Sequence, residues 1–253
     1  MPNSTGSILK KWRKLRRYSQ LQLAIELDIS SKHICFIETG KSKPSKEMII
    51  RLSHFLLLPK SEINTFLHSA GYAPIYTDLS VTDQSLKPVF EAIDKMIENH
   101  MPYPALVLNK DWDIIKTNDA ANQLMIALGF QNHNNIIEAL ISDNPKTSKI
   151  IDWHKTVQLI LIRLRQEISF LGDSARLQSL EKQLSDCLPA TEDQAISDEK
   201  IVLSTKFKIN NKVLSFFSII AQLSTVQDIT LSEYKVELMF PSDENTKVFY
   251  TYT

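Results

Sequence analysis

One predicted helix of the chain carries side chains whose chemistry suits the reading of base pairs. Ile34 and Ile37 recur at helical spacing and are expected to face inward. Ser31 and Lys32 are then exposed at the N-terminal end of that helix, and Phe36 lies further along. A lysine can donate hydrogen bonds to guanine O6 and N7, and an aromatic ring can pack on the methyl group of thymine. These residue types would suit contacts with base edges if the helix lay in the major groove of DNA.

The elements that must position these side chains are five short helices in the first 70 residues. Apolar residues recur every three or four positions, and Ser19, Ser30 and Ser45 are good N-cap residues. The helices are expected at about residues 6–17, 20–27, 31–38, between Ser45 and Pro59, and at 61–69. Phe36 has a second interpretation as a core aromatic. We favour exposure, because isoleucines already fill the inward face.

The distribution of charge agrees with a polyanionic partner for this part of the chain. The net charge of the 253 residues is zero. Residues 1–76 nevertheless hold twelve Lys and Arg against five Asp and Glu, which gives +7 and leaves −7 for residues 77–253. Nucleic acid and an anionic membrane both fit this asymmetry. The membrane is the weaker alternative, because Trp12 and Leu15 of the basic first helix are needed for the helical core.

Residues 19–45 read SQLQLAIELDISSKHICFIETGKSKPS and resemble the helix-turn-helix of the phage-repressor-like (XRE) regulators. The agreement covers core, cap and turn positions, namely Ser19, Gln20, Leu23, Ala24, Ile34, Ile37, Glu38, Gly40, Lys41, Pro44 and Ser45. The resemblance implies that Ser31, Lys32 and Phe36 occupy base-facing positions in the major groove. It also implies that the domain binds double-stranded DNA, and that a homodimer reads a palindromic operator.

Four further residues are predicted to contact DNA phosphates, which set register rather than sequence. Gln20 matches such a contact at the start of the first helix of the motif. Lys41 and Lys43 follow the base-reading helix in a loop. Arg13 matches a family pair with Glu38 that buttresses the motif, and its guanidinium is expected near a phosphate.

The remainder of the chain predicts a second domain of the α+β class. Residues 71–85 contain Gly, Pro and small polar residues and are predicted to be a linker between a domain at 1–70 and one at 86–253. An amphipathic helix at 86–97 precedes a hairpin over 105–116. Helices are then expected at about 119–128, 135–142, 150–170 and 173–188. Strands follow at 201–209, 213–221 and 234–240, with Asn210-Asn211 as a type I′ turn and a last strand through Val248, Tyr250 and Tyr252.

Several short motifs of this second domain resemble the MmyB-like regulators. The matching residues are Pro104, Ala105, Val107, Trp112, Asp113, Asn118, Ala120 and Ala121, with later agreement at Asp152-Trp153, Leu164-Arg165, Asp228–Leu231 and Phe240-Pro241. In that family an XRE head precedes a PAS-like domain, in which helices cover an antiparallel sheet and a small apolar, fatty-acid-like ligand is bound. The expected fold is therefore a five-helix helix-turn-helix domain followed by a PAS-like α+β domain.

A cavity between helices and sheet could hold such a ligand. The sequence offers as contacts Tyr103, Trp112, Asn118, Met125, Trp153, Arg163, Arg165, Phe207, Phe216 and Phe217. Either arginine could hold a carboxylate with two hydrogen bonds. Each aromatic residue could equally be core, each arginine could lie on a solvated helix face, and Asn118 also suits a helix N-cap.

Other classes of protein are less compatible with the sequence. No nucleotide-binding, hydrolase or metalloprotease motif is present, and the six histidines lack metal spacing. We therefore expect no enzyme, no metal and no cofactor besides the apolar ligand. Two distant cysteines, no signal-peptide pattern and no apolar run long enough to span a bilayer indicate a cytoplasmic protein without membrane contact. The function that results is ligand-modulated regulation by a dimer. The alternative is a ligand-independent regulator whose C-terminal domain serves only dimerisation or protein interaction.

Overall fold

The computed structural model describes residues 4–79, 83–172, 174–189, 204–223 and 228–251. The chain divides into two compact units. The first, here called the helical unit, holds Met1–Asp78, Gln166–Ser174 and Gln227–Ile229. The second, here called the sheet unit, holds Leu79–Arg165, Ala175–Val226 and Thr230–Thr253.

The helical unit is built from five helices that begin at serines in four cases out of five. The helices are α1 (Thr5–Leu15), α2 (Gln20–Glu26), α3 (Ser31–Glu38), α4 (Lys46–Phe55) and α5 (Lys60–Ser69). The hydroxyl groups of Ser4, Ser19, Ser30 and Ser45 each accept a hydrogen bond from the backbone three residues on, at 3.1–3.2 Å. These bonds satisfy donors that a helix leaves open at its start, and they explain why the sequence placed the helices well.

A close approach of α1 and the end of α3 fixes the geometry of this unit. Gly6 lies on α1, where an added Cβ would be 2.4 Å from the carbonyl oxygen of Glu38 and 2.6 Å from that of Ile37. Only a residue without a Cβ fits there. Further along α1, Leu9 and Trp12 contribute to a core that also contains Ile34 of α3. Helix α3 is therefore held against a fixed support.

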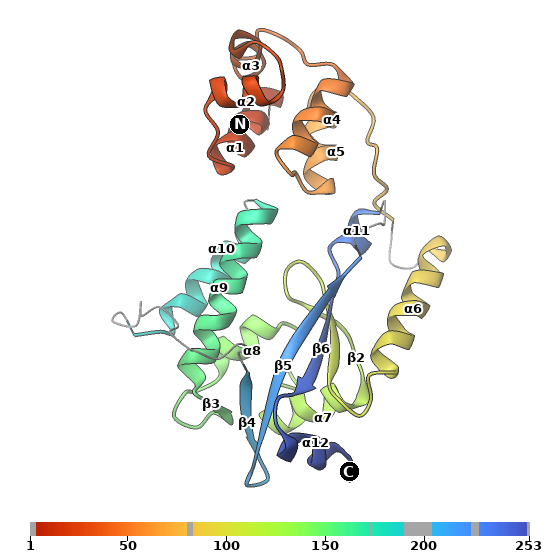
Figure 1. Ribbon diagram of the computed structural model, residues 1–253, viewed down its shortest axis with the longest axis vertical. Coiled ribbons are helices and arrows are strands. Elements are labelled where there is room, and N and C mark those ends of the chain that lie inside the picture. Colours follow the sequence, from red (N-terminus) through yellow and green to blue (C-terminus); the bar gives the residue numbers. More distant parts are fainter. Residues whose placement is uncertain (1–3, 80–82, 173, 190–203, 224–227, 252–253) are drawn as a thin grey trace. The chain divides into compact units, whose positions relative to one another are not determined.

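In the part of the sheet unit that the structure describes, six antiparallel strands form one sheet with helices on both faces (Figure 1). The strand order is β2-β1-β6-β5-β4-β3. The strands are β1 (Ala105–Leu108), β2 (Ile114–Thr117), β3 (Ile150–Ile151), β4 (Thr205–Ile209), β5 (Lys212–Gln222) and β6 (Lys235–Pro241). The helices that lie in this unit wholly or for the most part are η1 (Gln84–Leu86), α6 (Lys87–Glu98), α7 (Asp119–Leu128), α8 (Ile136–Ser142), α9 (Trp153–Leu171), α10 (Ala175–Asp186), α11 (Ile229–Ser232) and α12 (Glu244–Thr251). The end of α9, from Gln166, and the first residue of α11 belong to the helical unit.

Alternation along the strands separates two apolar layers. Val107 and Val236 are register partners on β1 and β6, and they pack with Ile93 and Ile97 of α6. Their neighbours Leu106 and Glu237 are also partners and point to the opposite face, since successive side chains of a strand alternate. Figure 1 shows α6 on one side of the sheet and α8 with α9 on the other. The fold class predicted from the sequence, helical followed by an antiparallel sheet with helices, is confirmed.

Two local predictions for the sheet unit need correction. The predicted helix from residue 150 begins at Trp153, because Ile150 and Ile151 pair with β4. The predicted last strand is helix α12, and Tyr252 lies outside the described residues. Asp243 accepts a hydrogen bond from the backbone N–H of Thr246 at 2.8 Å, which starts that helix.

The turn between β4 and β5 follows the sequence prediction. Asn210 and Asn211 have φ angles of 48° and 60°, as a type I′ turn requires.

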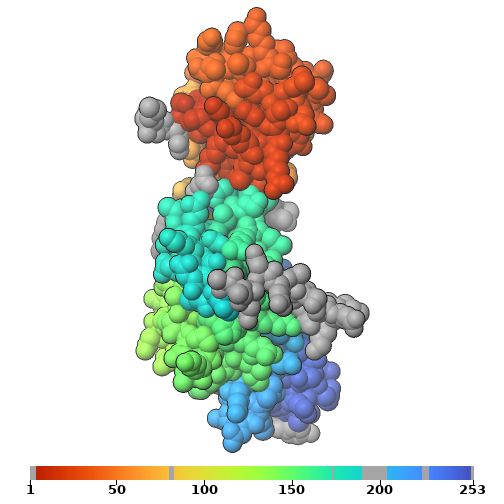
Figure 2. Space-filling view, turned by 90° about the vertical axis from the view of Figure 1, so that its left-hand side faces the viewer, coloured from red at the N-terminus to blue at the C-terminus, as the bar shows by residue number. Residues whose placement is uncertain are grey.

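The hydroxyl of Thr246 accepts a hydrogen bond from the backbone N–H of Ser215 at 2.8 Å, which anchors α12 to β5. The space-filling view shows the β4–β5 hairpin (light blue) beside α12 (darker blue) at one end of the sheet unit (Figure 2).

Candidate functional sites

The first candidate site is the solvent-facing side of α3. Ser31 and Lys32 are exposed, whereas Ile34 and Ile37 are completely buried. Phe36 is half-buried and lies under two ammonium groups, with Lys32 Nζ 5.5 Å and Lys41 Nζ 5.9 Å from the ring centroid. The three residues predicted to face bases therefore share one side of α3, and two lysines frame the aromatic ring.

A buried ion pair holds α3 against α1. Arg13 Nε donates to Glu38 Oε1 at 2.6 Å and Nη2 donates to Oε2 at 2.9 Å, so the pair is bidentate. Arg13 Nη1 donates to the carbonyl of Tyr18 at 2.7 Å, and Gln20 Nε2 donates to Glu38 Oε2 at 2.7 Å. One carboxylate thus ties the ends of α1, α2 and α3 together.

The charge of Glu38 is stabilised by these bonds. Burial alone would raise the pKa of Glu38, but the hydrogen bonds from Arg13 and Gln20 outweigh it and hold that pKa below its ordinary value. The hydrogen bond to Glu38 raises the pKa of Arg13 in turn, against the effect of burial. Both groups therefore stay ionised, and the arrangement supports the buttressing role that the sequence indicated for this pair.

The residues predicted to contact phosphates occupy different environments. Lys41 and Lys43 are exposed, and Lys43 Nζ lies 4.9 Å from the ring centroid of Tyr72. Gln20 is half-buried, with its amide nitrogen directed at Glu38. Arg13 is buried, and each of its three nitrogens donates a hydrogen bond inside the unit. The two lysines are therefore the members of this set that reach solvent most freely.

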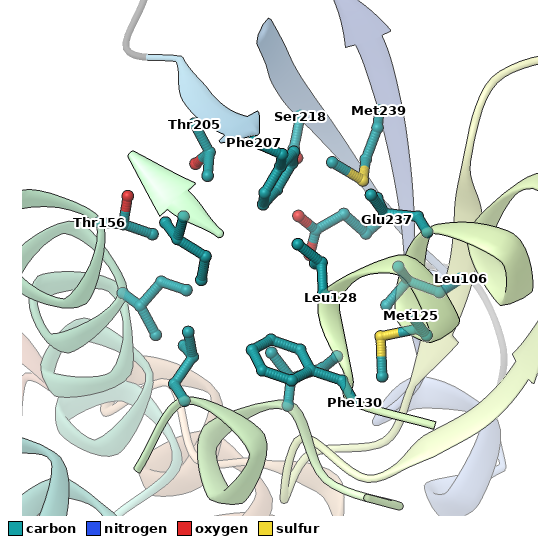
Figure 3. Close-up of a pocket in the computed structure, with 15 residues that line it drawn as sticks. Leu106, Met125, Leu128, Phe130, Thr156, Thr205, Phe207, Ser218, Glu237 and Met239 are labelled. Carbon is teal, nitrogen blue, oxygen red and sulfur yellow. The ribbon is translucent and has the colours of Figure 1, made fainter. Parts of the chain in front are cut away.

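The second candidate site is a cavity of about 120 Å³ inside the sheet unit. Fifteen residues line it, and most of them are apolar (Figure 3). Leu124, Met125 and Leu128 come from α7, Ile136 and Leu140 from α8, and Thr156 and Ile160 from α9, with Phe130 beside them. The opposite wall is the face of the sheet that α6 leaves uncovered. The cavity therefore lies between helices and sheet, as the sequence predicted for an apolar ligand.

Cross-strand pairs build the sheet wall of the cavity. Leu106 faces Glu237, Ser218 faces Met239, and Ile150 faces Phe207 in the strand register. All six of these residues line the cavity, together with Thr205. Because register partners on one face are only about 5 Å apart, each pair presents a continuous surface. The cavity is thus determined by pairing between strands that are far apart in the sequence.

The lining of the cavity includes a charged side chain, that of Glu237. Figure 3 shows the Glu237 carboxylate directed into the cavity. Its side chain keeps 18% of its area exposed, and Oε2 accepts a hydrogen bond from Arg163 Nη1 of α9 at 3.1 Å. The Arg163 guanidinium lies over the ring of Trp112, 4.3 Å from its centroid, and Lys235 Nζ lies 4.5 Å from the same ring. A glutamate therefore forms the charged part of the lining.

The residues that the sequence offered as ligand contacts are spread over the sheet unit. Met125 lines the cavity, and so does Phe207. The other members of the predicted set lie outside that lining: Tyr103, Trp112, Asn118, Trp153, Arg163, Arg165, Phe216 and Phe217. Trp112, Trp153 and Phe216 are buried core residues.

The polar members of the predicted set are engaged by neighbouring groups. Asn118 donates to the carbonyls of Ile97 and Tyr103 and accepts from the backbone N–H groups of Ala105 and Ala121, at 2.9–3.0 Å. It is thus the N-cap of α7 and joins three elements. Arg165 Nε donates to Glu181 at 2.7 Å on α10. Arg163 does hold a carboxylate, but the carboxylate belongs to Glu237.

The sequence analysis missed thirteen of the fifteen lining residues, and Glu237 is the charged one among them. The signal that could have found it is the alternation of β6, in which Val236 and Leu238 face α6 and the residues between them must face a covered surface as well. A charged residue on a strand that is covered on both faces needs a partner or a ligand. Lys235 and Glu237 both meet that description, and both are at least half-buried.

Comparisons with known proteins cover most of the chain. A family model described as helix-turn-helix matches residues 9–63, which contain α2 and α3 entirely. A family model described as the ligand binding domain of MmyB-like transcription regulators matches residues 89–249, which contain all fifteen residues of the cavity. No curated protein matches the chain. Among the described residues, no helix has the length and apolar character needed to cross a membrane.

Proposed function

This chain belongs to the MmyB-like transcription regulators, and from that premise we propose that it binds specific DNA sequences as a dimer whose affinity changes with a small apolar ligand. The general part of this statement follows from the family: the protein is a DNA-binding transcription regulator with a ligand-binding domain. The families matched are those of regulators, not of enzymes. The proposal adds the residues, the assembly and the kind of ligand.

The observation that carries the DNA-binding part is the free side of α3. Ser31, Lys32 and Phe36 share that side while Ile34 and Ile37 are fully buried, so the polar groups can enter a groove without unfolding the unit. We assign base contacts to these three residues. A hydrogen bond from Lys32 to guanine and packing of Phe36 on a thymine methyl group would each be worth about 1–3 kcal/mol of discrimination.

Phosphate contacts are assigned to the residues around α3. Lys41 and Lys43 are exposed beside it and can neutralise phosphates directly. Gln20 stands at the N-terminus of α2, where an amide can also reach a phosphate. Arg13 is buried, and its geometry supports an indirect role in phosphate binding. It orients Glu38 and, through Glu38, the amide of Gln20.

A homodimer and a palindromic operator complete the DNA-binding proposal. A helix of eight residues such as α3 contacts only a few base pairs. Two copies held roughly 34 Å apart would read two half-sites on the same face of the duplex, and would gain specificity without a larger reading surface.

The regulatory part of the proposal rests on the cavity in the sheet unit. Its apolar walls suit a small aliphatic, fatty-acid-like molecule, and Met125 lies among them. Such a ligand changes DNA affinity only if it binds one arrangement of the dimer more tightly than another. The alternative is a C-terminal domain that serves dimerisation alone. It predicts that occupation of the cavity leaves the affinity for DNA unchanged.

Two lysine variants test the DNA-binding assignment. Operators are first selected from random duplexes with the full-length protein, and binding is then followed by fluorescence anisotropy across a salt series. Lys32→Ala should relax specificity at one base pair at a cost of about 1–3 kcal/mol. Lys41→Ala should weaken binding to all sequences alike and reduce the salt slope by about one. Identical behaviour of the two variants would refute the docking of α3.

A cavity-filling variant separates ligand sensing from simple dimerisation. Native mass spectrometry of the purified protein, followed by organic extraction, identifies any molecule that adds mass. Leu128→Trp fills the cavity, and Ile126→Trp on the same helix is a matched control, because Ile126 is 62% exposed. If the proposal holds, Leu128→Trp abolishes the response of DNA binding to the extracted molecule and Ile126→Trp keeps it. If both variants bind DNA alike in every condition, the dimerisation module is the correct description.

A further inference from the structure

Helix α9 belongs to both units of the chain. It runs without a break over Trp153–Leu171, and its last turns, from Gln166 onward, are part of the helical unit. The part in the sheet unit contributes Thr156 and Ile160 to the lining of the cavity, where Figure 3 shows Thr156. An α-helix is stiff along its axis, because each turn is hydrogen-bonded to the next. A displacement of α9 at the cavity is therefore carried to its last turn.

The last turn of α9 is held by Arg16 of the helical unit. The final carbonyl groups of a helix have no partner within that helix. Those of Ser169 and Phe170 accept hydrogen bonds from Arg16 Nη1 at 2.7 Å and Nη2 at 3.0 Å. The positive charge at this end also interacts favourably with the helix dipole. Arg16 is therefore a side-chain cap of α9 that another element supplies.

The same guanidinium group caps α4. Arg16 Nε donates to the carbonyl of Leu56 at 2.9 Å, and Nη2 donates to that of Leu57 at 3.1 Å. Leu56 is the C-cap residue of α4, and Arg16 is itself the C-cap residue of α1. Three helices therefore end at one side chain. Because the donors of a guanidinium form a rigid fork, a shift of one helix end changes the hydrogen bonds at the others.

A glycine places the chain against the core of the helical unit directly after α9. Gly172 has a φ of +84°, and an added Cβ would lie 2.9 Å from Cη2 and Cζ2 of Trp12. Trp12 is completely buried, and its Nε1 donates to Glu62 of α5 at 3.0 Å. Only a residue without a side chain fits against this ring. The end of α9 is therefore docked on the core of the helical unit.

Helix α1 joins this contact to α3. Arg16 binds the end of α9, and Arg13 of the same helix holds Glu38 of α3 through two hydrogen bonds. Gly6 of α1 also lies against the end of α3. Each step from the end of α9 to α3 is thus a contact between helices of one unit, of the kind that can carry energetic coupling.

Resting on the proposed function, we infer that α9 transmits the occupation of the cavity to α3, and that Arg16 is the positioning residue that joins α9 to the helices assigned to DNA binding. A ligand that binds one position of α9 more tightly shifts the population toward that position. The carbonyls of Ser169 and Phe170 then move relative to that of Leu56, and the guanidinium holds α1 differently against α4. The α3 helices of a dimer fit their half-sites better or worse as a result.

The test measures how strongly a probe in the cavity changes the affinity for DNA. Full-length protein is freed of bound molecules, checked by native mass spectrometry, and titrated by calorimetry with sodium octanoate and sodium dodecanoate. The tighter of the two serves as the probe, and operator affinity is measured by fluorescence anisotropy with and without it. We expect the two operator affinities of the wild type to differ by about fivefold or more.

Two arginine variants assign this coupling to Arg16. Arg16→Met keeps the aliphatic stem and removes every donor to α4 and α9. Its operator affinities with and without the probe should differ by less than about twofold, while calorimetry still gives a probe affinity within about twofold of the wild-type value. Arg17→Met is the matched control, because it removes the same charge from an exposed side chain one residue later. It should keep the wild-type ratio.

A change in α9 itself gives an answer even if Arg16→Met fails to fold. Gln166 is exposed and lies where α9 passes into the helical unit. Gln166→Gly loosens the helix at that point, so the effect of the probe on operator affinity should fall to about half or less. Lys182→Gly makes the same kind of change at an exposed position of α10 and should leave the effect unaltered.

The outcomes separate this inference from the function on which it rests. If Arg16→Met and Gln166→Gly both respond to the probe as the wild type does, α9 is not the path, while ligand-modulated DNA binding stands. If the probe binds the wild type without changing its operator affinity, the proposed modulation is wrong, and the inference falls with it. If neither fatty acid binds the emptied protein, the ligand site itself is removed.

Discussion

Each unit of this protein contains an arginine–glutamate pair that joins two elements, and the pairs differ in how far they are sealed from their surroundings. The side chains of Arg13 and Glu38 are 9% and 3% exposed, and those of Arg163 and Glu237 are 22% and 18% exposed. The first pair is bidentate and Gln20 adds a third donor, whereas one hydrogen bond at 3.1 Å joins the second. The first pair can only support the fold, whereas Glu237 of the second pair also lines the cavity.

Removal of Glu38 should have the largest effect on stability. Glu38→Ala leaves the Arg13 guanidinium buried without its carboxylate, and loss of one partner of a buried pair costs about 3–5 kcal/mol. Urea unfolding followed by circular dichroism measures this loss. The double variant Arg13→Met with Glu38→Met should recover much of it, because two apolar groups need no partner. If Glu38→Ala lowers the free energy of unfolding no more than Glu237→Ala does, the two pairs do not differ as proposed here.

A methyl group added to Gly6 should have the next largest effect. Gly6→Ala places a Cβ 2.4 Å from the backbone oxygen of Glu38, so α1 and α3 must move apart. Overpacking of this kind costs about 1–3 kcal/mol. Gly129→Ala is the control in the sheet unit: its φ is +87° with no atom within 4 Å of the added Cβ, so only backbone strain of about 1 kcal/mol is expected. Urea unfolding ranks the two, and an equal loss would argue against the tight support of α3.

The open pair should tolerate a change that the sealed pair does not. Glu237→Gln is expected to lower the free energy of unfolding by at most about 1 kcal/mol, since partly solvated pairs contribute little. The same urea titration gives this value. A loss of several kcal/mol would mean that the Arg163–Glu237 pair is structural in the same sense as the Arg13–Glu38 pair.

The stability that the Arg13–Glu38 pair contributes should fall progressively as the pH is lowered. Burial would raise the pKa of Glu38, but the hydrogen bonds from Arg13 and Gln20 hold it below the ordinary value of 4.5. A pKa that is lower in the folded state than in the unfolded state stabilises the fold above pH 4.5, and that stabilisation is lost as the pH falls through the lowered value. Thermal unfolding between pH 6 and pH 3 should show this slope, and Glu38→Gln should flatten it. Glu244→Gln, an exposed control, should keep the wild-type slope.

The helical unit could be predicted from the sequence because its signals are local. Serines such as Ser19 and Ser30 mark the starts of helices within three residues, and Gly40 has a φ of +73° where the chain turns after α3. The outward position of Lys32 follows from the helical period alone. The strand turn at Asn210-Asn211 was predictable for the same reason, since both residues favour positive φ.

The cavity could not be predicted in this way, because register decides which side chains meet. Met125 and Phe207 were predicted, but the cavity wall also depends on the pairing of Leu106 with Glu237, which lie 131 residues apart in the sequence. The alternation of Val248 and Tyr250 suggested a strand, and the cap at Asp243 made a helix instead. Local sequence patterns therefore predict where helices and strands lie. The pairing of distant strands decides which side chains line the cavity.

The position of Trp112 gives the protein a built-in optical reporter. The chain has three tryptophans, and this one has the Arg163 guanidinium 4.3 Å from its ring centroid. The contact is electrostatic, so a movement of the guanidinium changes the field at the indole. Any molecule that draws Glu237 away from Arg163 will thereby alter the emission of Trp112. Steady-state fluorescence can follow the filling of the cavity with no added dye.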